Sequence, residues 1–347
     1  MYDCAKDVLA YHNDEVTLLR PQRTEMRDRR DANRDRLKNR LKADEKPLPE
    51  VFIKQGSYAM LTMVQEPDND YDIDDGVYFT QASLKDEGGN DMSPSDARQM
   101  VCNALKDGRF NKQPKVMKNC VRIFYEEGYH VDMPIYRIRE HDQQYELAAG
   151  DDWVLSRAAD VEEWFDNVNK TKSPDENNGR QFRRIVRLNK KFARSRNAWK
   201  DQIASGFTIT KLVEECYVAD ANREDVALRE TMKRIHNRLI GNLEVAHPVT
   251  PGAMLTKGPN DDSTAFLRDK LAAALDDLAV LDDADCTSKD ALAAWDKVFS
   301  TDFFSARQKE DATEKAGAAA NAAILGNLVS DQTNPRVVDK RGGGRFA

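Results

Sequence analysis

The sequence has little cysteine, little histidine and no long apolar run, and each shortage excludes a class of protein. The five cysteines are scattered, and none forms a CxxC pair or stands near a histidine at zinc-ligand spacing. We therefore expect reduced, mostly buried thiols and no zinc module. None of the five histidines forms a convincing catalytic pair, which leaves Ser-His-Asp chemistry without support. The cysteines are Cys4, Cys102, Cys120, Cys216 and Cys286.

No apolar run approaches the roughly 20 residues that a membrane-spanning helix needs. The first residues, MYDCAKDVLAYHNDE, lack a basic segment followed by an apolar stretch, so no secretory signal is predicted. We therefore expect a cytoplasmic protein with no membrane partner.

One segment is strongly basic, although the net charge of −7 argues against a general nucleic-acid coat. Between Arg20 and Lys42 the chain carries ten Arg and Lys residues, few helix breakers and many opposite charges one turn apart. This pattern predicts a long, largely solvated helix, packed through Met26, Leu37 and Leu41. Whether the helix also attracts polyanions, so that a nucleic acid is a partner, stays open at this point.

The 347 residues, 40% hydrophobic and 33% charged, are enough for two packed globular units. Residues 51–136 contain short runs typical of strands, interrupted by one helix that Ser93 caps and Gly108 ends. After about residue 150 the pattern changes to amphipathic helices. The sequence therefore predicts an α+β fold with a mixed sheet, a long N-terminal spine helix and a helical second lobe. The predicted parts are residues 1–150, with sheet and spine helix, residues 151–330, which are helical, and a flexible C-terminal tail at 331–347.

Four aspartates lie close together in DNDYDIDDG, at positions 70, 72, 74 and 75. Because alternate residues of a strand share a face, Asp72 and Asp74 should project side by side. Asp75 should face the other way, toward the following turn or a helix terminus. Two neighbouring carboxylates repel unless a cation lies between them, and carboxylate oxygens suit Mg²⁺ or Mn²⁺. Asp132, in the strand pattern HVDMPIY, would add a third acid, enough to hold two ions on a nucleotide substrate.

The tripeptide QGS at 55–57 stands upstream of the acid pair. A Gly-Ser turn after a strand exposes backbone N–H groups and a hydroxyl, which suit the terminal phosphates of a triphosphate. Gly-Ser is a common dipeptide, so it indicates a phosphate site only because it precedes the acid pair.

Together, QGSYAMLTMV, YDIDDGVYF and HVDMPIY resemble motifs of the DNA polymerase β-type nucleotidyltransferase superfamily. Within it they look closest to the bacterial cGAS/DncV-like nucleotidyltransferases (CD-NTases), and DIDDG and HVDMPIY are the specific segments. The resemblance extends more weakly through GRQFRRIVRLNKKF and PGAMLTKGP, so it covers nearly the whole chain. It implies a polymerase β-like catalytic lobe followed by a helical nucleotide-binding lobe.

The resemblance also implies roles for individual residues. Gly56 and Ser57 would bind the donor triphosphate, Asp72 and Asp74 would bind two Mg²⁺ ions, and Asp132 would be a further metal ligand that helps to deprotonate the acceptor hydroxyl.

By the same resemblance, Lys190 and Ser205 would contact the phosphates. The family often has two adjacent serines where this chain has Ser205 and Gly206. Tyr58 and Tyr78 are candidates for stacking on a base, although an aromatic near a strand end is more often part of the core.

The implied activity is the linking of nucleoside triphosphates, ATP and GTP, into a cyclic oligonucleotide, with a purine cyclic dinucleotide such as cyclic GMP-AMP as the expected product. The product would act as a second messenger in anti-phage (CBASS) defence. Relatives can have the C-terminus joined to other proteins by a ubiquitin-type ligase, and the tail ending KRGGGRFA suits this reaction.

Two other functions stay open. The first is a nucleotidyltransferase that modifies a macromolecule, a tRNA 3′ end or a partner protein, with the basic helix as its docking strip. The second is a non-catalytic nucleotide sensor, although three repelling acids at positions 72, 74 and 132 argue against this.

Overall fold

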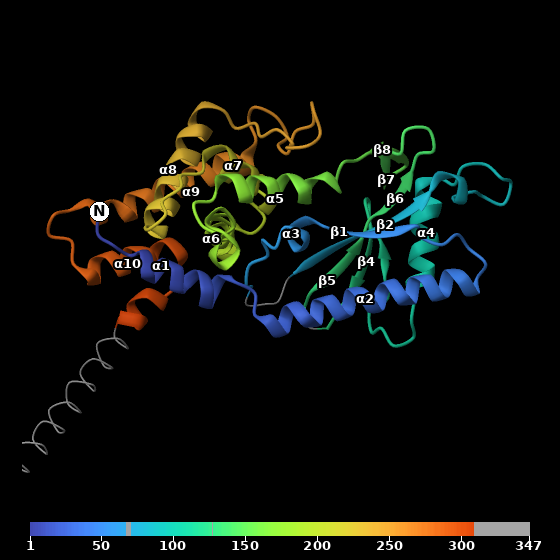
Figure 1. Cartoon of the computed structure of the whole chain (residues 1–347), viewed down its shortest axis with the longest axis horizontal. Helices are drawn as coiled ribbons and strands as arrows, with labels where there is room; N and C mark the ends of the chain where they lie inside the picture. The colour runs from blue at the N-terminus through green and yellow to red at the C-terminus, as the bar shows by residue number, and fades with distance from the viewer. Residues whose placement is uncertain (67–70, 127, 309–347) are drawn as a thin grey trace, which may run out of the picture.

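The computed structural model describes residues 1–66, 71–126 and 128–308. The end of the predicted helical region from residue 309, the tail and its proposed ligase attachment lie outside these residues, as does Asp70. The fold prediction is confirmed: a mixed sheet with a long spine helix stands beside a helical lobe (Figure 1).

The sheet is built around its central strand β2 (Asp72–Thr80). Strands β5 and β6 follow one another across Pro134, and both pair parallel with β2. Strand β1 pairs antiparallel with β2, and the path through the sheet is β3-β4-β5-β2-β6-β7-β8. The other strands are β1 (Val51–Gln55), β3 (Lys115–Val116), β4 (Val121–Phe124), β5 (His130–Met133), β6 (Ile135–Ile138), β7 (Tyr145–Ala149) and β8 (Asp152–Leu155).

The alternation of β2 divides its side chains between two environments. Ile73 and Val77 are wholly buried in a core that they share with α2 (Arg20–Ala43) and α4 (Pro94–Leu105). Met26, Leu37 and Leu41 are the buried residues predicted for the spine helix. Ser93 caps α4 by accepting a hydrogen bond from the Asp96 N–H at 3.1 Å, and the helix ends before Gly108.

Asp75 faces the spine helix, and its partner differs from the one that the sequence predicted. The sequence predicted a contact with the turn or a helix terminus. Instead, Arg34 in the middle of α2 donates from Nε to Asp75 Oδ2 at 2.7 Å and from Nη2 to Oδ1. Asp75 is wholly buried, so this ion pair joins helix and sheet inside the core. A partner 41 residues away in sequence has no local signal.

Two more cations of α2 contact the catalytic lobe. Arg29 donates to the Tyr129 hydroxyl at 3.2 Å, and Arg36 to Asp107 at 3.1 Å. The guanidinium of Arg36 also lies 4.6 Å from the ring centre of Phe110. These contacts engage part of the basic surface of α2, whereas Arg20, Arg23, Arg27, Lys38, Arg40 and Lys42 remain exposed.

The helical lobe has a second core, to which residues from before the spine helix also contribute. Helix α1 (Ala5–Tyr11) lies in this core, where Cys4, Val8 and Tyr11 are buried, although it precedes the spine helix in sequence. The sheet also continues past residue 150 through β8. The lobe's other helices are α5 (Asp160–Lys172), α6 (Gln181–Arg194), α7 (Gly206–Cys216), α8 (Glu224–Gly241), α9 (Asp262–Asp277) and α10 (Ser288–Phe299). In the described parts of the chain, no helix is both long and apolar enough to cross a membrane.

Candidate active site

The register of the central strands brings the three predicted acids together. Asp74 of β2 lies opposite Asp132 of β5, and Asp72 lies opposite His130. The Asp72 side chain is 56% exposed, whereas Asp132 is buried. One of the three acids is therefore open to a ligand, and two lie at the floor of the site.

The electrostatics of this cluster centre on Asp74. Burial raises its pKa to about 7, and the neighbouring charges of Asp132 and Asp72 act in the same direction. Three carboxylates so close together carry a net negative charge that a divalent cation would offset.

Arg122 of β4 is a member of the cluster that sequence reasoning missed. Its Nε and Nη2 each donate to an Asp132 oxygen at 2.7 Å, and Nη2 lies 3.4 Å from Asp72. These hydrogen bonds raise the pKa of the guanidinium. The hairpin from β4 to β5 pairs Arg122 directly with Asp132, so the strand alternation of VRIF was the available signal.

Arg122 also binds one of the three acids, which do not by themselves form a complete metal site. Within the described residues, no three His, Cys, Asp or Glu side chains converge closely enough to hold an ion as they stand. Both oxygens of Asp132 are engaged by the guanidinium. The donor set still fits Mg²⁺, which needs only one or two carboxylates beside water and phosphate oxygens.

The Gly-Ser turn forms α3 (Gly56–Ala59) at the end of β1 and packs against the acids. Gly56 has a φ of +62°, and a Cβ there would lie 2.1 Å from Asp74 Oδ2. Only glycine therefore allows the turn to approach the carboxylate so closely. Ser57 follows at the wall of the same cavity.

Lys190 reaches this region from α6 of the helical lobe. Its Nζ donates to the Thr62 carbonyl at 2.8 Å, and burial, with the charges of Arg194 and Arg187, lowers its pKa to about 7. Gly206 makes room for it, since a Cβ at that position would lie 2.9 Å from Lys190 Cε. The departure from the two-serine pattern therefore has a packing role.

Lys190 belongs to a row of α6 cations that hold the segment after the turn. Arg183, Arg187 and Lys191 share its face, and each donates to a backbone carbonyl of residues 60–65. The acceptors are the carbonyls of Met60, Leu61, Thr62 and Gln65.

Ser205 caps α7 rather than pointing freely at a ligand. Its hydroxyl accepts from the Thr208 N–H at 3.1 Å and lies 2.9 Å from the Thr208 hydroxyl. It borders a cavity of about 320 Å³ that also contains Lys190 and Asp72.

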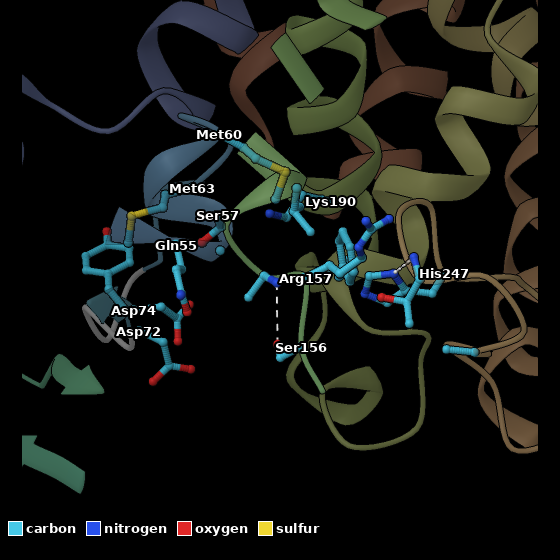
Figure 2. A pocket seen from close by; sticks show the side chains of 18 of the residues that line it. Gln55, Ser57, Met60, Met63, Asp72, Asp74, Ser156, Arg157, Lys190 and His247 are labelled. Atoms are coloured by element: carbon cyan, nitrogen blue, oxygen red, sulfur yellow. Dashed lines mark hydrogen bonds between the residues drawn. The ribbon is translucent and has the colours of Figure 1, made fainter. Parts of the chain in front are cut away.

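The larger cavity, of about 530 Å³, lies between the lobes and brings together Gly56, Ser57, Asp72, Asp74 and Lys190 (Figure 2). Its other walls contain residues that sequence reasoning missed. They include Arg157, Phe207, His247 and Thr250.

Neither tyrosine proposed for base stacking is among the residues that line this cavity. Tyr78 is wholly buried, with its ring stacked on Tyr136 at 4.4 Å between centres. The Tyr58 hydroxyl accepts from Arg30 at 3.3 Å, beside α2.

Residues 50–136 match the family model described as "Cyclic GMP-AMP synthase DncV-like, nucleotidyltransferase domain". The structure of Vibrio cholerae DncV cyclic AMP-GMP synthase with a linear pppApG intermediate is similar, with a TM-score of 0.70 and 16% identity over 86% of this chain and 96% of that chain. The structure of E. coli MS115-1 CdnC with ATP is also similar, with a TM-score of 0.63 and 17% identity over 86% of this chain and 98% of that chain. At these identities the structures establish the shared fold.

Proposed function

This chain carries a nucleotidyltransferase domain of the DncV-like family, in the polymerase β-type superfamily, and from that premise we propose that it links nucleoside triphosphates into a cyclic oligonucleotide. The observation that carries the proposal is one cavity where the acid pair, the Gly-Ser turn and a buried lysine of the other lobe meet. Asp132 stands beside it in the register of the sheet.

The chain's own groups divide the chemistry between them. The backbone and hydroxyl of Gly56 and Ser57, with Lys190, bind the triphosphate and orient its α-phosphorus. Asp72 and Asp74, with Asp132, would hold two Mg²⁺ or Mn²⁺ ions, which supply charge stabilisation to the attacking and leaving oxygens.

A ribose hydroxyl of the acceptor nucleotide attacks the α-phosphorus, and the bond to pyrophosphate breaks. Asp132 takes up the hydroxyl proton, and the P–O bond that forms replaces the one lost. In a second round a hydroxyl of the linear product attacks the α-phosphorus of its own 5′ triphosphate, a second pyrophosphate leaves, and the ring closes.

For substrates we propose ATP and GTP, and for the product a purine cyclic dinucleotide such as cyclic GMP-AMP that signals in anti-phage defence. The relatives support this choice, because one is described with a pppApG intermediate and another with ATP. Ser205 contributes through the start of α7, which it caps beside Lys190.

The rival function, modification of a macromolecule, is less well supported by the spine helix. A docking strip needs cations that face solvent, whereas Arg29, Arg34 and Arg36 are bound to groups of the catalytic lobe. These three arginines therefore act within the catalytic lobe, and only the exposed cations of α2 are left for docking a macromolecule.

The test is to incubate purified protein with the four triphosphates and Mg²⁺ and to identify products by mass spectrometry. We expect a cyclic dinucleotide without any added polymer, and none from the Asp72→Asn variant. Transfer that requires tRNA or a partner protein would instead support the rival function, and nucleotide binding without any transfer would support a sensor.

A further inference from the structure

The cavity extends well beyond the groups assigned to phosphates and metals. In Figure 2, Asp72 and Asp74 lie at one end, Ser57 and Lys190 lie along the wall, and His247 lies far from the acid pair. When a nucleotide binds with its phosphates near the acids and Lys190, its base occupies the remaining space of the cavity. The residues at the His247 end are therefore placed to contact the base.

His247 belongs to the Pro/Gly loop between α8 and α9, and its ring organises that loop. Its Nδ1 accepts backbone N–H bonds from Val249 at 3.3 Å and from Thr250 at 3.1 Å. The His247 N–H in turn donates to the Ala253 carbonyl at 2.9 Å. Thr250 and Ala253 line the cavity, so this turn forms part of its wall.

These bonds fix the tautomer of the imidazole. An Nδ1 that accepts two hydrogen bonds carries no proton, so the proton of the neutral ring is on Nε2. Burial lowers the pKa of His247, which favours the neutral form. Among the residues of the three described stretches, none hydrogen-bonds with Nε2, and His247 lines the cavity.

Two neighbours complete this end of the cavity. The ring of Phe207, near the start of α7, lies 5.5 Å from the His247 ring at an interplanar angle of 73°. Arg157, in the connection between the lobes, donates to the Val249 carbonyl at 3.4 Å and so links the loop to the opposite wall. An apolar ring and a fixed N–H donor together suit a flat heteroaromatic ligand.

We propose that His247 is a specificity-determining residue that selects guanine over adenine by donating its Nε2–H to O6 of the base, with Phe207 packed against the base. This inference rests on the proposed function and assigns one base site within it. Guanine presents two adjacent acceptors, O6 and N7, on one edge, whereas adenine presents N7 beside the N6 amino donor. A donor that faces position 6 is accepted by O6 of guanine and meets the N6 amino donor of adenine, whereas a donor to N7 would bind both bases.

The two nitrogens of His247 can be tested separately. In His247→Asn the amide oxygen takes the place of Nδ1 and keeps the loop bonds, but nothing replaces Nε2. In His247→Gln the amide nitrogen reaches the place of Nε2 and donates, but the loop acceptor is lost. His141→Asn is the matched control, since that histidine is 71% exposed in the turn between β6 and β7.

The measurement is equilibrium binding of non-hydrolysable GTP and ATP analogues with Mg²⁺, together with KM and kcat for each substrate. We expect the wild type to prefer the GTP analogue and His247→Asn to lose about tenfold of that preference, the value of one hydrogen bond in a closed site. The loss should fall on the KM for GTP. His247→Gln should keep the preference and unfold at a lower temperature, and His141→Asn should match the wild type.

Three results would overturn the inference: equal binding of both analogues by the wild type, an unchanged preference in His247→Asn, or loss of preference only in His247→Gln. The last result would mean that the ring acts solely on the loop. If the wild type bound nucleotide but transferred none, the proposed function would fail, and the binding series would still decide the role of His247.

Discussion

Replacing Asp75 by Asn tests whether this acid stabilises the fold, in contrast to Asp72 and Asp74, which are proposed to act in the reaction. Asp75 is wholly buried and paired through both oxygens with Arg34, whose side chain remains 23% exposed. Removing one partner of a buried pair costs about 3–5 kcal/mol. Because Arg34 reaches solvent and the amide oxygen still accepts one bond, we expect a loss of about 2–3 kcal/mol.

The assay has two arms. Thermal unfolding should show a Tm lower by about 4–12 °C, at the 2–4 °C per kcal/mol of a domain of this size. Product formation, measured at a temperature where the variant is folded, should persist. A double mutant with Arg34→Met should lose about 1–2 kcal/mol less than the sum of the single losses, since both changes remove the same pair.

The contrasting variant is Asp72→Asn, which should form no product while unfolding at the wild-type temperature or above, because one repelling charge is gone. The reasoning fails if folded Asp75→Asn protein is inactive and as stable as the wild type. That outcome would shift the register of β2 by one residue and move the site to a different pair of acids.

Burial lowers the pKa of Lys190 from 10.5 to about 7, whereas a bound triphosphate favours its ammonium form, so binding at pH 8 should take up roughly one proton. Calorimetry in buffers of different ionisation enthalpy measures this uptake, which should vanish in Lys190→Met; equal uptake by the variant would refute the assignment. Mg²⁺ or Mn²⁺ should support turnover and Ca²⁺ only nucleotide binding, because its longer coordination misplaces the reacting oxygens; product in EDTA would contradict a metal mechanism. Gly56→Ala should abolish product formation, because its Cβ meets Asp74, whereas Gly89→Ala, with a similar positive φ of 82° and no atom within 4 Å, should lose stability alone.

The parts of the site that the sequence predicted are those that short-range geometry determines. Strand alternation separates Asp72 and Asp74 from Asp75, and the Gly-Ser turn follows its strand directly. The apolar pattern around Asp132 marks a strand, and its pairing with the strand of Asp72 and Asp74 was a condition of the prediction rather than a result of it.

The parts that escaped prediction depend on contacts between distant segments. Arg34 meets Asp75 across 41 positions, and α1 joins the core of a lobe that follows it by more than 150 residues. His247 lies in a Pro/Gly loop without periodicity, and its position on the cavity is set by the fold of the helical lobe. Side-chain patterns do not record such pairings.

The row of α6 cations has a consequence for engineering the two lobes as modules. Four positive side chains of one lobe are the hydrogen-bond donors for carbonyls in a loop of the other, and Arg187 and Lys190 are almost fully buried there. Cutting the chain at the connection would strand buried cations on one fragment and unsatisfied carbonyls on the other. A chimera that exchanges helical lobes between relatives therefore needs the spacing of residues 183, 187, 190 and 191 to be transplanted with them, or the loop behind the Gly-Ser turn will lose its shape.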